Sequence, residues 1–317
     1  MIFQRYPILI HLSLLLTAVI WGATFVAVKY VVEQVGPAGV VLLRVGLSSA
    51  CFVALLGFTW RTIPRMPAAV WRQLALIAVC GSVVNNLAIA WGQSYLAAAL
   101  ASLIVTSNPI FTTIISRLLL GEPLTRRKLS GIAVAFSGFM IVLLYGGSEA
   151  RFSIDNAVGI LILICAPLGW ATYTVLSKPL LQEYEPHVVA GLTTILGAVM
   201  LSPLLVFNAD IVAQAAAFSW KSWLAAITMS VLAVFVAYIL WYRGLRGLEP
   251  TQVAVYVYLV PFFGVLFAWL LLGETITRYL LLGGATILTG VIVTNSGRRP
   301  PAEPLDGENQ RLPRGRV

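Results

Sequence analysis

The chain has 317 residues, of which 59% are hydrophobic and only 10% are charged, and its formal net charge is +9. A soluble domain carries roughly a quarter charged residues, so this composition does not supply a water-facing surface. The sequence therefore predicts an integral membrane protein and excludes a soluble globular domain.

Long stretches without Asp, Glu, Lys or Arg recur along the chain. A helix that rises 1.5 Å per residue needs about 20 apolar residues to cross the hydrocarbon. The run from Gln73 to Ser116 is too long for one crossing and is expected to break at 92–94. Strands are excluded because an open sheet edge is unsatisfied in lipid. We predict ten transmembrane helices at about 8–32, 37–58, 72–92, 95–119, 127–145, 157–178, 187–207, 220–243, 250–272 and 278–296.

One segment of the chain occurs twice. Trp21–Lys29 reappears 149 positions later as Trp170–Lys178, with tryptophan and lysine at the two ends of each copy. Farther on, a proline, a Gly-Glu pair, a threonine and two glycines recur 152 positions apart in the same order. They are Pro109, Gly121, Glu122, Thr125, Gly131 and Gly138, then Pro261, Gly273, Glu274, Thr277, Gly283 and Gly290. This self-similarity predicts two copies of one unit. Because the first span carries the first copy, we expect it to be retained and not cleaved as a signal peptide.

The distribution of basic residues predicts the direction of each crossing. If the N-terminus is cytoplasmic, almost all of the 21 Lys and Arg residues fall on the cytoplasmic side or within helices. The exceptions are Arg151, Lys221 and Arg278. This bias follows the positive-inside rule and predicts that both termini are cytoplasmic. Since topology explains the net charge, we expect no nucleic-acid partner.

Five spans per copy is an odd number, so the second copy must cross the membrane in the opposite direction. Inverted repeats are the architecture of secondary transporters, which hold the substrate near the midplane between the repeats. The predicted fold class is all-α integral membrane, with ten transmembrane helices as two inverted five-helix repeats. The predicted parts are a cytoplasmic N-terminus at 1–7, a first repeat at 8–145, a second, inverted repeat at 157–296, and a disordered cytoplasmic tail at 297–317.

The duplicated Trp21–Lys29 segment and the duplicated proline, Gly-Glu and glycine positions resemble the drug/metabolite transporter superfamily, in its ten-helix EamA branch. The resemblance covers residues 8–296. It implies a carrier of the bacterial inner membrane, often an exporter of amino acids or related metabolites. It also implies a central cavity bounded by spans three, four, eight and nine. It does not specify the substrate, because cargo differs widely within this branch.

Polar and aromatic side chains within those four spans are the candidates for the cavity. Buried amides and hydroxyls are costly in hydrocarbon unless they meet a partner or water. Amides beside aromatic rings suit a small amphipathic molecule such as an amino acid, although Trp and Tyr also gather at membrane interfaces. The candidates are Asn85, Asn86, Trp91, Ser107, Asn108, Tyr238, Trp241, Gln252 and Tyr256.

Three basic residues are candidates for charge or gate roles. Lys29 and Lys178 occupy equivalent ends of spans one and six. Arg44 lies about two turns into span two, where a charge costs about 2.5–3.5 kcal/mol on insertion scales. It could attract an anionic group of the cargo, pair with Glu33, or extend toward the membrane surface. The repeat places Thr193 opposite Arg44, so the second copy lacks this charge.

The repeated prolines, glutamates and glycines have structural interpretations. Pro109 and Pro261 each remove a backbone N–H at equivalent depths and predict either a static kink or a hinge. Glu122 and Glu274 would fall on opposite sides of the membrane, so we expect a structural and not a catalytic role. The glycines of spans five and ten predict close helix packing within the chain.

Several functions are not expected from this sequence. His11 and His187 lack the partners that a catalytic site requires. Cys51, Cys80 and Cys165 are too far apart for a metal-ligand pattern, so no cofactor or metal is predicted.

The predicted function is that of a secondary transporter, an exporter of amino acids or related small metabolites by alternating access. We expect it to act as a monomer or homodimer in the lipid bilayer. No Asp or Glu lies in the middle of a span, so transport is expected to be facilitative, exchange-like, or proton-coupled through water and Lys29. The alternatives are a lipid or lipid-linked-sugar flippase and a non-transporting membrane assembly partner.

Overall fold

The computed structural model describes residues 7–92, 95, 104–145, 157–272 and 278–296. In this part of the chain the secondary structure is entirely helical, with turns and short connections between helices and no strand. The predicted all-α class is therefore confirmed. Several predictions concern residues outside the described ranges: the tail at 297–317, the side chain of Lys29, and the repeated residues Gly273, Glu274 and Thr277.

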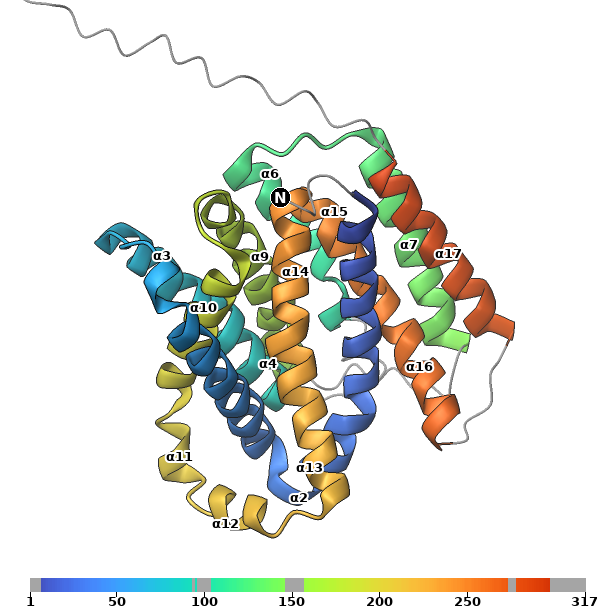
Figure 1. Cartoon of the computed structure of the whole chain (residues 1–317). Helices are drawn as coiled ribbons and strands as arrows, with labels where there is room; N and C mark the ends of the chain where they lie inside the picture. Colours follow the sequence, from blue (N-terminus) through green and yellow to red (C-terminus); the bar gives the residue numbers. More distant parts are fainter. Residues whose placement is uncertain (1–6, 93–94, 96–103, 146–156, 273–277, 297–317) are drawn as a thin grey trace, which may run out of the picture.

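The first half of the chain runs back and forth as long helices (Figure 1). The first of these, α2 (Pro7–Thr59), consists of two helices that meet at Gly36, whose φ of 66° favours glycine, with Pro37 directly after it. A short 3-10 turn follows at Trp60–Thr62. The remaining elements of this half are α3 (Ala68–Ala78), η2 (Val79–Val84), α4 (Asn85–Gly92), α6 (Asn108–Leu120) and α7 (Arg126–Tyr145).

The helices of the second half also run back and forth, and two short helices, α11 and α12, lie in the connection between α10 and α13 (Figure 1). Its elements are α8 (Ala157–Leu163), α9 (Cys165–Glu183), α10 (Pro186–Leu201), α11 (Leu204–Phe207), α12 (Ile211–Ala216), α13 (Trp220–Ile227), η4 (Thr228–Val236), α14 (Ala237–Gly247), α15 (Pro250–Ala254), η5 (Val255–Tyr258), α16 (Leu259–Leu272) and α17 (Arg278–Asn295). We call the end of the bundle where α2 begins the N-face. The start of α15 and the end of α6 lie at the same end (Figure 1).

The helices have the length and apolarity of membrane spans. In the described part of the chain, six helical stretches are long and apolar enough to cross a membrane. Shorter apolar helices lie at Ile8–Thr24, Ile104–Leu120, Pro186–Leu201 and Leu281–Asn295, where the sequence predicts spans one, four, seven and ten. The chain is therefore a multi-pass membrane protein.

The turn between α6 and α7 has the capping residues that the repeat predicts. Gly121 ends α6 with a φ of 67°, and its N–H donates to the Ser116 carbonyl. The Thr125 hydroxyl accepts a hydrogen bond from the backbone N–H of Lys128 at 3.2 Å, which caps the start of α7. The Gly-Glu and threonine positions of the first copy thus define a helix end and the next helix start.

Helices α7 and α17, the last helices of the two halves, pack side by side along one edge of the molecule (Figure 1). A Cβ atom on Gly138 would lie 2.7 Å from the Gly283 carbonyl oxygen, and one on Gly131 would lie 2.9 Å from the Gly290 oxygen. Residue numbers rise along α7 as they fall along α17, so the two helices are antiparallel. The expected glycine-mediated packing within the chain is confirmed.

This contact gives a first prediction. We expect Gly138→Val to lower the free energy of unfolding in detergent by about 1–3 kcal/mol, because the added atoms would overpack the helix contact. Ala133→Val on the exposed side of the same helix is the control and should leave the unfolding midpoint nearly unchanged. Equal stability of the two variants would show that α7 and α17 separate without cost.

Each half of the chain contains a π-helix, and the two π-helices lie at equivalent positions. The sequence analysis did not predict them. The first, η2, begins at Val79, and the second, η4, begins 149 residues later at Thr228. A π-helix widens the helical turn and often marks a functional region. Here η2 packs against α9 and α10, and η4 packs against α2. The sequence repeat therefore extends to an unusual backbone conformation in the interior of the bundle.

Candidate functional site

Six aromatic residues from α2, α9 and α14, five of them buried and Trp21 partly buried, form one cluster, which we call the central aromatic cluster. Its members are Trp21, Trp170, Tyr173, Tyr238, Trp241 and Tyr242. The ring centroids of Trp21 and Trp170 are 5.4 Å apart in an edge-on contact, and those of Trp21 and Trp241 are 5.2 Å apart. Such contacts stabilise the cluster beyond simple burial. The two tryptophans that mark the sequence repeat thus meet each other.

Hydrogen bonds fix some members of the central aromatic cluster, whereas the Tyr173 hydroxyl and the Trp241 indole N–H have no partner among the described residues. The Trp21 indole N–H donates to the Ala233 carbonyl in η4 at 2.8 Å, and the Tyr242 hydroxyl pairs with Ser177 at 2.8 Å. Trp241 is 1% exposed, and its indole nitrogen has no hydrogen-bond partner among the described residues. A buried unpaired donor is costly, so this N–H is available to a ligand.

The first π-helix, η2, packs closely against α9 and against the Tyr173 ring of the central aromatic cluster. Gly81 in η2 lies directly on the Tyr173 ring, so a side chain at that position would collide with the ring. A Cβ atom on Gly169 in α9 would lie 2.5 Å from the Cys80 carbonyl oxygen of η2. These contacts bring the interrupted third span onto the helix that carries Trp170.

Arg44 lies on α2 between the face that packs against the eighth span and the face that packs against the third span. The Arg44 Nε atom is buried and has no hydrogen-bond partner among the described residues. The expected alternative, an ion pair with the exposed Glu33, is not formed in this structure.

The predicted amide candidates are already bonded within the protein. Asn85 donates to the Ala166 carbonyl of α9 at 3.0 Å, and Asn86 donates to the Ser82 carbonyl of its own helix at 2.8 Å. Asn108 is buried and accepts a hydrogen bond from the Thr112 hydroxyl at 3.0 Å. These contacts join spans or stabilise single helices.

The other predicted cavity residues lie in several places. Tyr238 and Trp241 are together in the central aromatic cluster. The Ser107 hydroxyl donates to the Ile104 carbonyl at the break before α6, and Trp91 is 40% exposed. Gln252 accepts from the Glu249 backbone N–H at 3.3 Å and completes a capping box at the start of α15 on the N-face.

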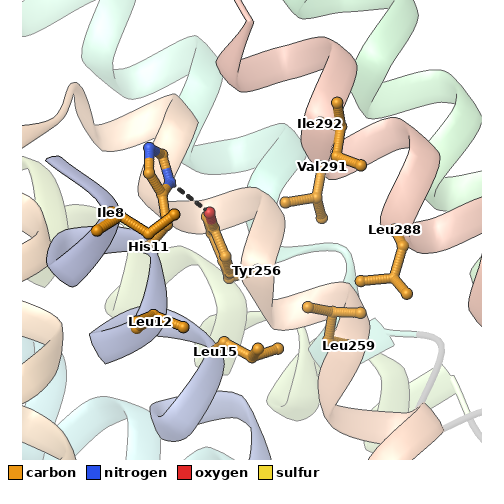
Figure 2. Close-up of a pocket in the computed structure, with 9 residues that line it drawn as sticks. All are labelled: Ile8, His11, Leu12, Leu15, Tyr256, Leu259, Leu288, Val291 and Ile292. Carbon is orange, nitrogen blue, oxygen red and sulfur yellow. Dashed lines mark hydrogen bonds between the residues drawn. The ribbon is translucent and has the colours of Figure 1, made fainter.

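Tyr256 lines a separate groove between α2, α17 and the η5–α16 region (Figure 2). The Tyr256 hydroxyl lies 2.6 Å from Nδ1 of His11, and the remaining walls are apolar. The groove has a volume of about 170 Å³. It is lined by Ile8, His11, Leu12, Leu15, Tyr256, Leu259, Leu288, Val291 and Ile292.

Lys178 holds the end of α14 at the N-face. Its ammonium donates to the carbonyls of Leu245, Arg246 and Leu248 at 2.7, 3.2 and 2.9 Å. A cation at a helix C-terminus also interacts favourably with the helix dipole. Lys178 therefore ties α9 to α14, next to the ion pair of Arg246 with Glu185 at 2.9 Å.

A buried ion cluster, formed by Lys128, Glu122 and Glu249, joins the two halves at the N-face. The Lys128 ammonium lies 2.9 Å from Glu122 and also contacts Glu249. Glu122 in turn accepts hydrogen bonds from the Ser116 hydroxyl and the Thr251 backbone N–H. The bonding of Glu122 agrees with its predicted structural role.

Both predicted hinge prolines follow a break in their helix. Helix α6 begins directly after a turn at Ser107, and Pro109 is its second residue. Pro261 is the third residue of α16, directly after the 3-10 segment η5. Broken helices of this kind line the binding sites of many transporters. Motion about these breaks stays a prediction.

The structure is a multi-pass helical bundle with repeated backbone features and aromatic rings in its interior. The chain belongs to the EamA-like transporter family, whose model matches residues 8–144 and 157–296. This confirms the family resemblance of the repeated residues, and the family is one of transporters.

Relatives match this chain over nearly their whole length. It is 29% identical to an "Uncharacterized transporter" of Archaeoglobus fulgidus, over 90% of this chain and 97% of the relative. It is 29% identical to a "Probable terminal-alkyne amino-acid exporter" of Streptantibioticus cattleyicolor, over 92% and 95%. It is 27% identical to a "Probable amino-acid metabolite efflux pump" of Salmonella typhimurium, over 90% and 94%. A solved crystal structure at 19% identity has the same fold, with a TM-score of 0.74 over 89% of this chain and 95% of that chain.

Proposed function

We propose that this protein is a secondary transporter that exports amino acids or related small metabolites by alternating access. The observation that carries the proposal is the contact of Trp21 with Trp170 within the central aromatic cluster, where equivalent segments of the two halves meet. Aromatic ring faces attract an ammonium group, and the rings also accommodate an apolar side chain. The names of the exporter and efflux-pump relatives support the same substrate class.

The proposal includes ten crossings arranged as two inverted repeats. Two observations support it. The antiparallel contact of α7 with α17 joins the last helix of one half to the last helix of the other. The π-helices η2 and η4 occupy equivalent positions in the two halves. An inverted pair has two conformations of similar energy, which is the property that alternating access requires.

We further propose an inner-membrane location with the N-face toward the cytoplasm. Helix ends at the N-face carry Arg61, Arg72, Arg126 and Arg246, which follows the positive-inside rule. In this orientation the cytoplasmic end of the seam between the halves is closed, because Lys128 of the first half contacts Glu249 of the second and Leu14 packs against Gly244. Transport requires these contacts to open.

A flux experiment tests the proposal. Proteoliposomes loaded with a panel of radiolabelled amino acids should exchange at least one of them with external unlabelled amino acid. An imposed pH gradient separates the expected modes, because accumulation that a protonophore abolishes would show proton coupling. Absence of exchange for every amino acid, with folded protein in the vesicles, would refute the proposed substrate class.

The flippase alternative is favoured by one observation. The groove beside Tyr256 is lined by Ile8 and Ile292, which are 64% and 66% exposed, so the groove is open to the side of the bundle. Fluorescent lipids that change leaflet only in vesicles containing the protein would favour a flippase over an amino-acid exporter.

A further inference from the structure

We propose that Arg44 binds a carboxylate of the cargo, so that the transport site recognises an organic anion or the anionic end of a zwitterion. This inference rests on the proposed transport function and names the residue and the ligand chemistry of the same site. It is carried by the buried Nε atom of this side chain, which has no hydrogen-bond partner among the described residues, and by the direction in which the side chain leaves α2.

The Arg44 side chain has a buried donor, its Nε–H, without an acceptor among the described residues. A guanidinium carries five N–H donors and stays charged, so a partner for it must be an acceptor, best of all an anion. The Nε atom is buried without a hydrogen bond, and no described carboxylate pairs with the group. Glu122 and Glu249 are bound to Lys128, and Glu185 is bound to Arg246. A charge held in a membrane interior without a partner indicates a functional site.

The packing of its neighbours on α2 shows that the Arg44 side chain points toward the middle of the bundle. Leu43 and Leu47 lie on the face of α2 that packs against α13 and η4. Val41 and Val45 lie on the face that packs against α4, η2 and α10. At about 100° per residue, Arg44 projects between these two faces. Its side chain therefore points between the third and eighth spans, both of which contain a π-helix.

The eighth span, one of the two spans between which Arg44 points, suits a carboxylate with an apolar or ammonium group attached. Tyr238 and Trp241 lie one helical turn apart on the α14 part of this span. The buried Trp241 N–H, which has no hydrogen-bond partner among the described residues, is a second donor on the same span. The rings of Trp21 and Trp170 are in contact with Trp241. Arg44 and the eighth span thus supply anion donors together with ring faces.

The second half of the chain shows that the helix scaffold does not require this charge. Thr193 occupies the position equivalent to Arg44, is fully buried, and donates to the Val189 carbonyl of its own helix at 2.8 Å. The equivalent helix α10 packs with a neutral side chain at this position. Arg44 is therefore an asymmetric addition to a symmetric scaffold, as expected for a specificity residue.

Binding of radiolabelled benzoate to the purified full-length protein tests the inference. Benzoate is a small aromatic carboxylate, and benzamide is its neutral counterpart of the same shape. We expect saturable benzoate binding to the wild type, with benzamide competing at least about tenfold more weakly, since ion-assisted hydrogen bonds to a carboxylate are worth this much. Arg44→Gln should remove that preference, whereas Arg44→Lys should keep part of it. The control Arg61→Gln, at an exposed site beside Trp60, should bind as the wild type does.

The outcomes separate this inference from the transport function. Unchanged benzoate preference in folded Arg44→Gln, or no saturable benzoate binding by the folded wild type, would overturn the carboxylate site. Arg44-dependent benzoate binding without amino-acid exchange in proteoliposomes would support the site and refute the proposed amino-acid export. Equal exchange rates of carboxylate substrates in wild type and Arg44→Gln would refute the site and leave export in place.

Discussion

Replacing Lys128 with alanine is expected to lower the free energy of unfolding by about 3–5 kcal/mol, the largest stability loss that we predict for one substitution. Lys128 is buried, and its ammonium contacts Glu122 and Glu249 and donates to the Pro123 carbonyl at 2.9 Å. Its removal leaves the buried carboxylate of Glu122 without its counter-ion. Reversible unfolding in detergent measures the loss.

Two further variants distinguish the ion cluster from a general effect of charge. Arg126→Ala removes an exposed basic residue two positions away and should change stability by less than about 0.5 kcal/mol. The double variant Lys128→Met with Glu122→Gln should lose less stability than the sum of its two single changes, because it removes the unpaired charge. Additive losses would show that the two side chains act independently.

The buried ion cluster also shows where sequence reasoning ends. Arg126, Arg127 and Lys128 are adjacent in the chain and satisfy the positive-inside rule equally well. Lys128 alone is buried, because it lies on the side of α7 that faces the turn after α6 and the start of α15. Its partner Glu249 is more than a hundred residues away. A contact between two halves of a chain cannot be predicted from charge alone.

The helices themselves were predictable because apolar length is a local property. Charge-free runs mark the helices, and the Gly121 and Thr125 positions mark a helix end and a helix start. The π-helices were not predictable, because a one-residue change of helical register depends on packing against other spans. Gln252 was assigned to the cavity on its polarity, yet its three-residue spacing from Glu249 is the signature of a capping box.

The central aromatic cluster was only partly predictable. The sequence indicated Tyr238 and Trp241 as site residues, and it identified Trp21 and Trp170 only as markers of the repeat. The twofold relation that we propose for the two halves would bring equivalent residues together near its axis, so the repeat itself held a signal for their contact. Tyr173 and Tyr242, whose rings stack at 5.4 Å, extend the cluster toward Ser177.

Replacing Trp170 with phenylalanine is expected to reduce amino-acid exchange at least about tenfold while the protein stays folded. Trp170 contacts Trp21, Tyr238 and Trp241, with the Tyr238 ring centroid at 5.4 Å. A smaller ring loses these edge contacts and weakens the attraction for a cation, and a loss of about 1.4 kcal/mol corresponds to tenfold. Phenylalanine is preferred to alanine because Trp→Ala in a core costs about 3–5 kcal/mol of stability.

The control for this substitution is Trp220→Phe, at a tryptophan that is 71% exposed at the start of α13. Exchange by this variant should equal that of the wild type. Initial exchange rates in proteoliposomes, normalised to folded protein, measure both. If Trp170→Phe and Trp220→Phe transport equally well, the contact between the repeated tryptophans is a packing feature, and the cargo must cross elsewhere in the bundle.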